Sequence, residues 1–119
     1  MALRCVLVDD SEEFLASAAR LLESQGMVVV GCATNSAEAL DLVAKLEPDL
    51  ALVDIELADE DGIALTRTLQ ERAPGTRVVL ISAYERDDLS DLISDSRAVG
   101  FLPKSALGLR AIAGLLRLA

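Results

Sequence analysis

The feature that most constrains the fold is a regular alternation of short apolar runs with longer segments of helical periodicity. The runs are rich in β-branched residues and recur at near-regular intervals, at Arg4–Val8, Met27–Ala33, Leu50–Val53, Arg77–Ser82 and Gly100–Leu102. Several of them are continuously apolar rather than alternating, which is typical of strands covered on both faces. The pattern therefore predicts five strands of a parallel sheet.

The segments between and after these runs carry apolar residues at helical spacing. The predicted helices are Ser11–Gln25, Ala37–Glu47, Ile63–Ala73, Asp87–Ser96 and Ala106–Leu118. Asn35 followed by Glu38 is typical of an N-terminal cap on the second helix, and Gly26 stands where a glycine ends the first. The fourth helix has a narrow apolar face and several aspartates, so we expect it to have low local stability.

Strands that alternate with helices predict a parallel sheet with right-handed crossovers. Five such units are too few for a barrel of eight strands. We therefore expect an α/β fold of the flavodoxin-like kind, with a doubly wound five-stranded parallel sheet in the order 2-1-3-4-5 and helices on both faces. Pro103 cannot donate to a strand ladder, so the fifth strand should lie at an edge. These units use all 119 residues, and we expect one domain, 1–119, with no output domain in this chain.

Composition excludes several classes of function. Acidic residues outnumber basic ones 20 to 11, and a net charge of −9 disfavours binding to a phosphate backbone. The chain has no His, which excludes a His-based triad, a His-ligated zinc site and phosphohistidine chemistry within it. No apolar run approaches the ~18 residues needed to span a membrane, so we expect a cytoplasmic protein with no membrane partner. Cys5 and Cys32 are expected to be free, buried thiols.

The candidate site lies at the carboxyl ends of the predicted strands, where open α/β sheets bind their ligands. Asp9 and Asp10 follow the first strand and Asp54 follows the third, and these two strands are neighbours in the predicted order. Ser82 ends the fourth strand and Lys104 follows the fifth. We therefore expect three carboxylates, a hydroxyl and an ammonium to converge.

The chemistry of this group of side chains favours a hard cation. Three carboxylates repel one another unless a cation neutralises them or some are protonated. Oxygen ligands without imidazole or thiolate favour Mg²⁺, Mn²⁺ or Ca²⁺, and few protein ligands with room for a phosphate are typical of Mg²⁺. A carboxylate can also act as the nucleophile in phosphoryl transfer and form an aspartyl phosphate. Lys104 and the metal would then neutralise phosphoryl oxygens, and Ser82 would donate a hydrogen bond to one.

A series of short motifs then points to a family. Val-Asp-Asp follows the first strand, Val-Asp ends the third, Asp61-Gly62 comes shortly after, Ile-Ser-Ala ends the fourth and Gly-Phe-Leu-Pro-Lys lies near the end. Over nearly the whole chain they resemble the receiver domain of bacterial response regulators. The stretch from Gly100 to Ser105 is similar to the subfamily that usually precedes a helix-turn-helix DNA-binding domain.

The resemblance implies roles for particular residues, with Asp54 as the phosphoacceptor. The implied metal ligands are Asp9, Asp10, Asp54 and the backbone carbonyl of Glu56. The implied phosphoryl contacts are Ser82, Ala83 and Lys104, and the implied switch residues are Ser82 and Phe101. Glu56 and Tyr84 are implied to tune the lifetime of the phosphoryl group. For Phe101, a ring of an edge strand packed on the core is an equally good account.

The chain departs from the family pattern in two places. Ala58 stands where the family often has Pro, which predicts a less rigid loop. Ser105 follows Lys104 where many members have Pro, so the cis peptide often found there is not expected. Pro103 instead precedes the lysine, and the sequence does not set the isomer of the Leu102–Pro103 bond.

Together these observations predict a signalling switch controlled by phosphorylation rather than an enzyme, beyond assisting its own phosphorylation and dephosphorylation. Because the chain has no His, a sensor histidine kinase would supply the phosphoryl group, with Mg²⁺ bound and Mn²⁺ as a possible substitute. The expected output is control of transcription through a homodimer or the release of an output domain. DNA contact would come only through a domain outside this chain.

Two other functions remain open at this stage. One is a receiver-like interaction module that acts without phosphorylation. The other is a Mg²⁺-dependent phosphohydrolase with Asp54 as nucleophile, although Glu56 stands where haloacid-dehalogenase-type enzymes carry a second Asp and the chain has no room for a substrate cap. A nucleotide binder is set aside, because no glycine-rich phosphate loop follows the first strand.

Overall fold

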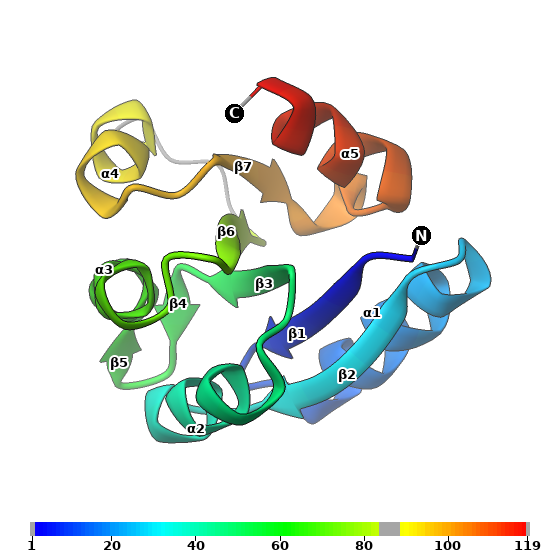
Figure 1. Cartoon of the computed structure of the whole chain (residues 1–119), viewed down its shortest axis with the longest axis horizontal. Coiled ribbons are helices and arrows are strands. Elements are labelled where there is room, and N and C mark those ends of the chain that lie inside the picture. The colour runs from blue at the N-terminus through cyan, green and yellow to red at the C-terminus, as the bar shows by residue number, and fades with distance from the viewer. Residues whose placement is uncertain (1, 84–88, 119) are drawn as a thin grey trace.

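The computed structural model describes residues 2–83 and 89–118, and its centre is a five-stranded parallel sheet (Figure 1). The strands in spatial order are β2 (Val28–Ala33), β1 (Arg4–Val8), β3 (Leu50–Asp54), β6 (Arg77–Ser82) and β7 (Gly100–Pro103). This order confirms the predicted 2-1-3-4-5, since β6 and β7 are the fourth and fifth strands of the sheet. Pro103 lies on β7, which is an edge strand as predicted.

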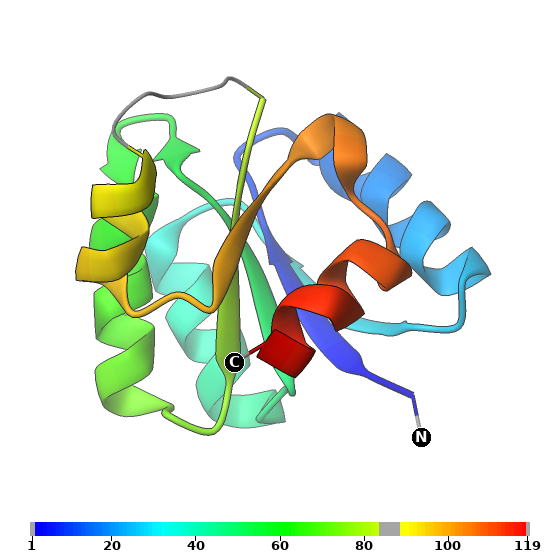
Figure 2. The same cartoon turned by 90° about the horizontal axis from the view of Figure 1, so that it is seen from above.

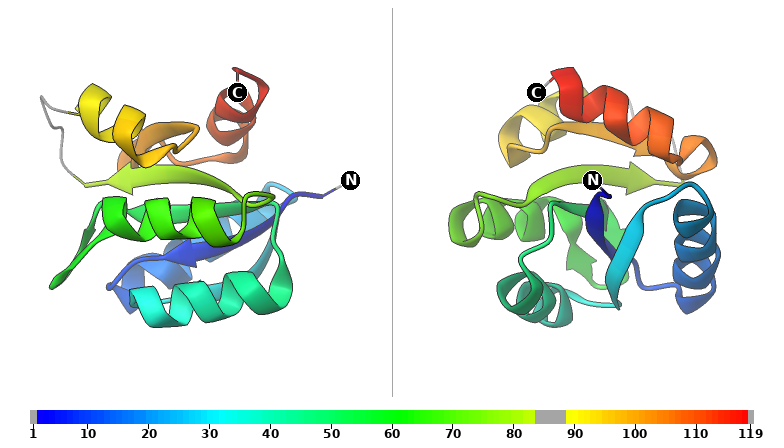
Figure 3. Two further views of the ribbon diagram at one scale, coloured as in Figure 1. Left: turned by 60° about the vertical axis from the view of Figure 1, so that its left-hand side comes forward. Right: turned by 45° about the vertical axis from the view of Figure 1, so that its right-hand side comes forward.

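Helices cover both faces of the sheet (Figures 2 and 3). They are α1 (Glu12–Ser24), α2 (Ser36–Leu46), α3 (Gly62–Arg72), α4 (Leu89–Ser96) and α5 (Leu109–Leu118). In the figures α1 and α5 lie on one face, and α2, α3 and α4 lie on the other. Among the described residues, no helix has both the length and the apolar character to cross a membrane.

The two helical layers explain the continuous apolar runs. Along β1, Val6 and Val8 join the core cluster beneath α2 and α3, while Cys5 and Leu7 join the cluster beneath α1 and α5. All four side chains are buried. Successive residues of a strand point to opposite faces, so a strand covered on both sides needs apolar residues at every position.

Two predictions about local structure needed correction, and a third falls partly outside the described residues. The last helix begins at Leu109 and not at Ala106, because Lys104–Ala106 form a 3₁₀ turn, η1, and Leu107 is extended. The fourth helix begins at Leu89 in the described residues, and the start predicted at Asp87 lies outside them. Both cysteines are free, but only Cys5 is buried: Cys32 is exposed because β2 is an edge strand.

A small antiparallel hairpin, β4 (Glu56–Leu57) and β5 (Glu60–Asp61), joins β3 to α3 and was not predicted. The turn between β4 and β5 contains Ala58, whose φ of 51° lies in the left-handed region. Proline is restricted to φ near −65°, so this backbone excludes the Pro that the family often has here. The Leu102–Pro103 and Lys104–Ser105 peptide bonds are trans, the second as predicted.

Candidate functional site

The carboxyl ends of β1, β3, β6 and β7 surround a cleft of about 300 Å³. Its lining residues are Asp9, Asp10, Ser11, Asp54, Glu56, Ala58, Ser82, Ala83 and Lys104. Every predicted site residue is among them except two. Tyr84 lies outside the described residues, and Phe101 is packed against the core cluster beneath α2 and α3. The sheet therefore brings the predicted site residues together in one place.

The three aspartates form a compact cluster of carboxylates. Asp9 directly follows β1 and Asp54 ends β3, and these two strands pair in register. One carboxylate oxygen from each of Asp9, Asp10 and Asp54 lies within 4.8 Å of the others. The side chains of Asp9 and Asp54 are only 1% and 8% exposed, whereas Asp10 is exposed. Two of the three negative charges are therefore largely removed from water.

The ammonium of Lys104 joins the two buried carboxylates. Nζ forms an ion pair with Asp9 Oδ2 and donates a hydrogen bond of 3.0 Å to Asp54 Oδ2. Burial acts to lower the pKa of Lys104, but the close contacts of its ammonium with both carboxylates, and their negative charge, outweigh burial and hold the pKa above its ordinary value. Lys104 therefore remains positively charged at neutral pH.

Backbone N–H groups hold the other oxygens. Asp54 Oδ1 accepts a hydrogen bond from Glu56 N at 3.0 Å, and Asp9 Oδ1 accepts one from Ser11 N at 2.9 Å. Asp9 Oδ2 is buried and meets Lys104 as an ion pair without the geometry of a hydrogen bond, and no other partner lies among the described residues. An oxygen in this state retains lone pairs for a cation.

The pKa of Asp54 is raised above its ordinary value. Burial is the main cause, the hydrogen bonds from Glu56 and Lys104 act against it, and the charge of Asp9 adds to it. Ionisation of Asp54 therefore costs free energy in the folded protein, even with the Lys104 ammonium beside it. Three carboxylates and a main-chain carbonyl are ligands that fit Mg²⁺ and similar hard cations.

Gly62 allows the first turn of α3 to lie directly against the end of β3. Its N–H donates to Ile55 O at 2.9 Å, and a Cβ on Gly62 would lie 1.9 Å from the backbone oxygen of Asp54. The neighbouring Asp61 caps α3 by accepting a hydrogen bond from Ile63 N. The Asp61-Gly62 pair, which served only as a family marker in the sequence, therefore supports the position of Asp54.

Sequence reasoning missed Phe14 as a site residue. None of the motifs in the sequence gives this phenylalanine a place in the site, yet Lys104 Nζ lies 4.3 Å from the centroid of its ring. An ammonium at this distance from an aromatic face is attracted by the ring quadrupole. The available signal was its place in the first turn of a helix that begins beside Asp9 and Asp10.

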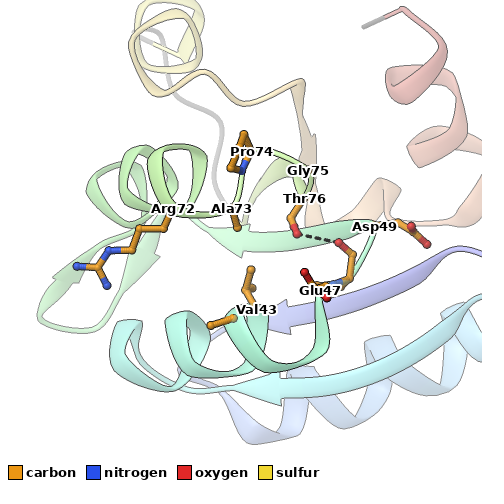
Figure 4. A pocket seen from close by; sticks show the side chains of 10 residues that line it. Val43, Glu47, Asp49, Arg72, Ala73, Pro74, Gly75 and Thr76 are labelled. Carbon is orange, nitrogen blue, oxygen red and sulfur yellow. Dashed lines mark hydrogen bonds between the residues drawn. The ribbon is translucent and has the colours of Figure 1, made fainter.

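A larger cleft of about 440 Å³ lies at the opposite, amino ends of the strands, between the ends of α2 and α3 (Figure 4). Thr76 Oγ1 donates a hydrogen bond of 2.7 Å to Pro48 O there. Its charged lining residues, Glu47, Asp49 and Arg72, are all exposed. This cleft holds no buried charged side chain. The cleft lined by Asp9, Asp10 and Asp54, called the acidic cleft below, is therefore the stronger candidate.

Comparisons with known proteins point to the same family as the sequence motifs. Residues 5–113 match the family model described as response regulator receiver domain. A protein-glutamate methylesterase/protein-glutamine glutaminase of Pseudomonas syringae is 36% identical over 108 residues, which cover 88% of this chain and 28% of that protein. The chain therefore spans less than a third of the length of the curated relatives it matches.

Two solved structures extend the likeness. The signal receiver domain of the putative response regulator NarL from Mycobacterium tuberculosis is 32% identical, with a TM-score of 0.77 over 89% of this chain and 86% of that one. A response regulator protein from Burkholderia pseudomallei, with a phosphorylated aspartic acid and a calcium ion, is 27% identical. Its TM-score is 0.84 over 96% of this chain and 66% of that one.

We expect Gly62→Ala to lower the free energy of unfolding by about 3 kcal/mol or more, because the added methyl group meets backbone rather than a flexible side chain. Gly75→Ala is the matched control, since nothing lies within 4 Å of its added Cβ and its φ is not positive. Urea denaturation of both variants measures the difference. Equal stabilities would contradict the close approach of α3 to β3.

We expect Asp54→Asn to raise the free energy of unfolding at pH 7 in the presence of a chelator. The raised pKa means that ionised Asp54 costs stability above its folded-state pKa, and that this cost disappears below the ordinary pKa of aspartate. The gain should therefore shrink as the pH falls to about 3. Exposed Asp59 offers a control, and Asp59→Asn should change stability by less than about 0.5 kcal/mol. A less stable Asp54→Asn at pH 7 would contradict the raised pKa.

Proposed function

This chain belongs to the response regulator receiver domain family, and from that premise we propose that it is a signalling switch whose Asp54 accepts a phosphoryl group. The observation that carries the proposal is the placement of Asp54, buried at the end of β3 with the Lys104 ammonium and two further carboxylates beside it. A carboxylate nucleophile needs nearby positive charge, because it must approach a phosphoryl group that is itself anionic.

The reaction follows from the contacts of Asp54. A carboxylate oxygen of Asp54 forms a bond to the phosphorus of the donor while the bond from phosphorus to the leaving group breaks, and the leaving group keeps the electron pair. The hydrogen bond from Glu56 N fixes the carboxylate, and Lys104 is available to the oxygens of the transferred group. Asp9, Asp10, Asp54 and the main-chain carbonyl of Glu56 would hold Mg²⁺, or Mn²⁺ in its place, which supplies positive charge for those oxygens.

The proposed phosphodonor is a phosphohistidine outside these residues. The chain has no His, so a phosphohistidine donor must come from a partner, for which we propose a sensor histidine kinase in the cytoplasm. Ser82 is buried at the end of β6, and Ala83 follows it on the wall of the cleft. We assign Ser82 and Ala83 to contact with the phosphoryl group.

The proposed switch has two states and connects Ser82 with Phe101. Phe101 is half-buried on the edge strand β7, in register with Leu80 of β6, two residues before Ser82. Movement of Ser82 toward a phosphoryl group would change the space open to this ring and bias the surface around α4 and β7. Glu56 and Tyr84 remain our candidates for tuning phosphoryl lifetime.

The output is proposed only in general terms. The matched relatives include a protein-glutamate methylesterase, of which this chain spans less than a third, and the receiver of a putative response regulator named NarL. We propose that residues 1–119 act as one receiver unit that controls a partner domain or protein. Transcriptional control through a DNA-binding domain outside these residues, with a homodimer as the active form, is one such output.

The test is incubation with Mg²⁺ and acetyl phosphate, followed by measurement of the intact mass. We expect one phosphoryl adduct that is labile to base, absent in Asp54→Asn and retained in the control Asp59→Asn. Chelation of the metal should abolish it. Absence of any adduct, with Mg²⁺ binding also absent, would favour the interaction module that acts without phosphorylation. Rapid multiple turnover of a general phosphomonoester would favour the phosphohydrolase.

A further inference from the structure

An aromatic ring from the first turn of α1, that of Phe14, lies against Lys104, one of the residues that line the acidic cleft. We propose that Phe14 is a positioning residue, whose ring holds the Lys104 ammonium at the cleft and so increases the rate at which Asp54 is phosphorylated. This inference rests on the proposed function, since it names a further residue of the same site. Nothing in the receiver-type motifs of the sequence assigns such a role to Phe14.

Lys104 needs such a partner because its side chain is long and flexible. The ammonium is carried on four methylene groups, and ordering it costs conformational entropy. Among the described residues, three neighbours hold Nζ: Asp9 Oδ2, Asp54 Oδ2 and the ring of Phe14, whose centroid lies 4.3 Å away. The side chain is only 18% exposed, so the attraction between the ammonium and the ring is little screened by water.

The ring is itself held by the site. Asp9 Oδ1 accepts a hydrogen bond from Ser11 N at 2.9 Å, and Ser11 Oγ accepts one from Phe14 N at 3.1 Å as the N-cap of α1. Asp9 Oδ2 in turn forms the ion pair with Lys104. Asp9, Ser11, Phe14 and Lys104 are therefore linked in a ring of contacts, each residue touching the next. This fixes the Phe14 ring relative to the carboxylates.

An uncharged ring is suited to this task because its attraction does not depend on the charge of Asp54. When Asp54 becomes esterified, its own carboxylate no longer attracts the ammonium, and the new partners of Lys104 are phosphoryl oxygens. A carboxylate in place of Phe14 would compete with those oxygens. The attraction of the ring for an ammonium does not require an ionised Asp54, so it can hold Lys104 near the cleft before and after transfer.

The contact can be tested without phosphorylation, by the proton chemical shifts of the Lys104 side chain. The ring should shift these protons upfield in the wild-type protein and in Phe14→Tyr, and the shift should disappear in Phe14→Leu and Phe14→Met. Two apolar replacements guard against a variant that fails to fold. Retention of the shift in both of them would overturn the contact.

The role is tested by a double-mutant cycle on the initial rate of phosphorylation by acetyl phosphate. We expect Phe14→Leu to slow the wild-type protein about fivefold and Phe14→Tyr to stay within about twofold. Within Lys104→Met, Phe14→Leu should cause no further loss, because Phe14 acts through Lys104. A full additional loss in that background, or no loss in the wild-type background, would overturn the proposal.

The experiments distinguish failure of the proposed function, phosphorylation of Asp54, from failure of the role of Phe14. In the first case, wild-type protein would gain no adduct with acetyl phosphate and Mg²⁺, although the shift of the Lys104 protons was present. A normal adduct in the wild-type protein, with equal rates in Phe14→Leu, would instead remove the role of Phe14 alone.

Discussion

The structure depends on the ion pairs that Lys104 forms with Asp9 and Asp54. The carboxylates of Asp9 and Asp54, 1% and 8% exposed, stand at the ends of neighbouring strands, where burial and the charge of Asp9 oppose the ionisation of Asp54. The ammonium offsets these costs because β7, at the edge of the sheet, ends immediately before Lys104. Gly62 and Ser11 complete the arrangement, one by letting α3 approach Asp54 and the other by donating to Asp9.

The same interaction connects stability to function. One ammonium does not fully offset the buried acids, as the raised pKa of Asp54 indicates, so the site retains an attraction for further positive charge. A hard cation would satisfy this need, and a phosphoryl group on Asp54 would give Lys104 new partners. The cluster therefore costs stability in the resting protein, which is common where side chains are placed for function.

Much of the fold and of the site followed from the sequence because local patterns decide both. Periodicity located the strands, Pro103 marked an edge, and the order 2-1-3-4-5 was enough to bring Asp9, Asp54 and Lys104 together. The missed features depend on contacts between elements, or on whether another element covers a side chain. These are the late start of α5, where Gln25 accepts a hydrogen bond from Leu109 N, the exposure of Cys32, the close approach of Gly62, and the contact of Phe14 with Lys104. Periodicity in one segment carries no information about them.

The most direct test of the central interaction is the affinity of the unphosphorylated protein for Mg²⁺, measured by calorimetry in the wild type and in Lys104→Met. Because the ammonium contacts the carboxylate oxygens that would hold the cation, its removal should tighten Mg²⁺ binding by about fivefold or more. Lys45→Met, at an exposed lysine paired with Asp41, should leave the affinity unchanged. Equal or weaker binding by Lys104→Met would contradict the account.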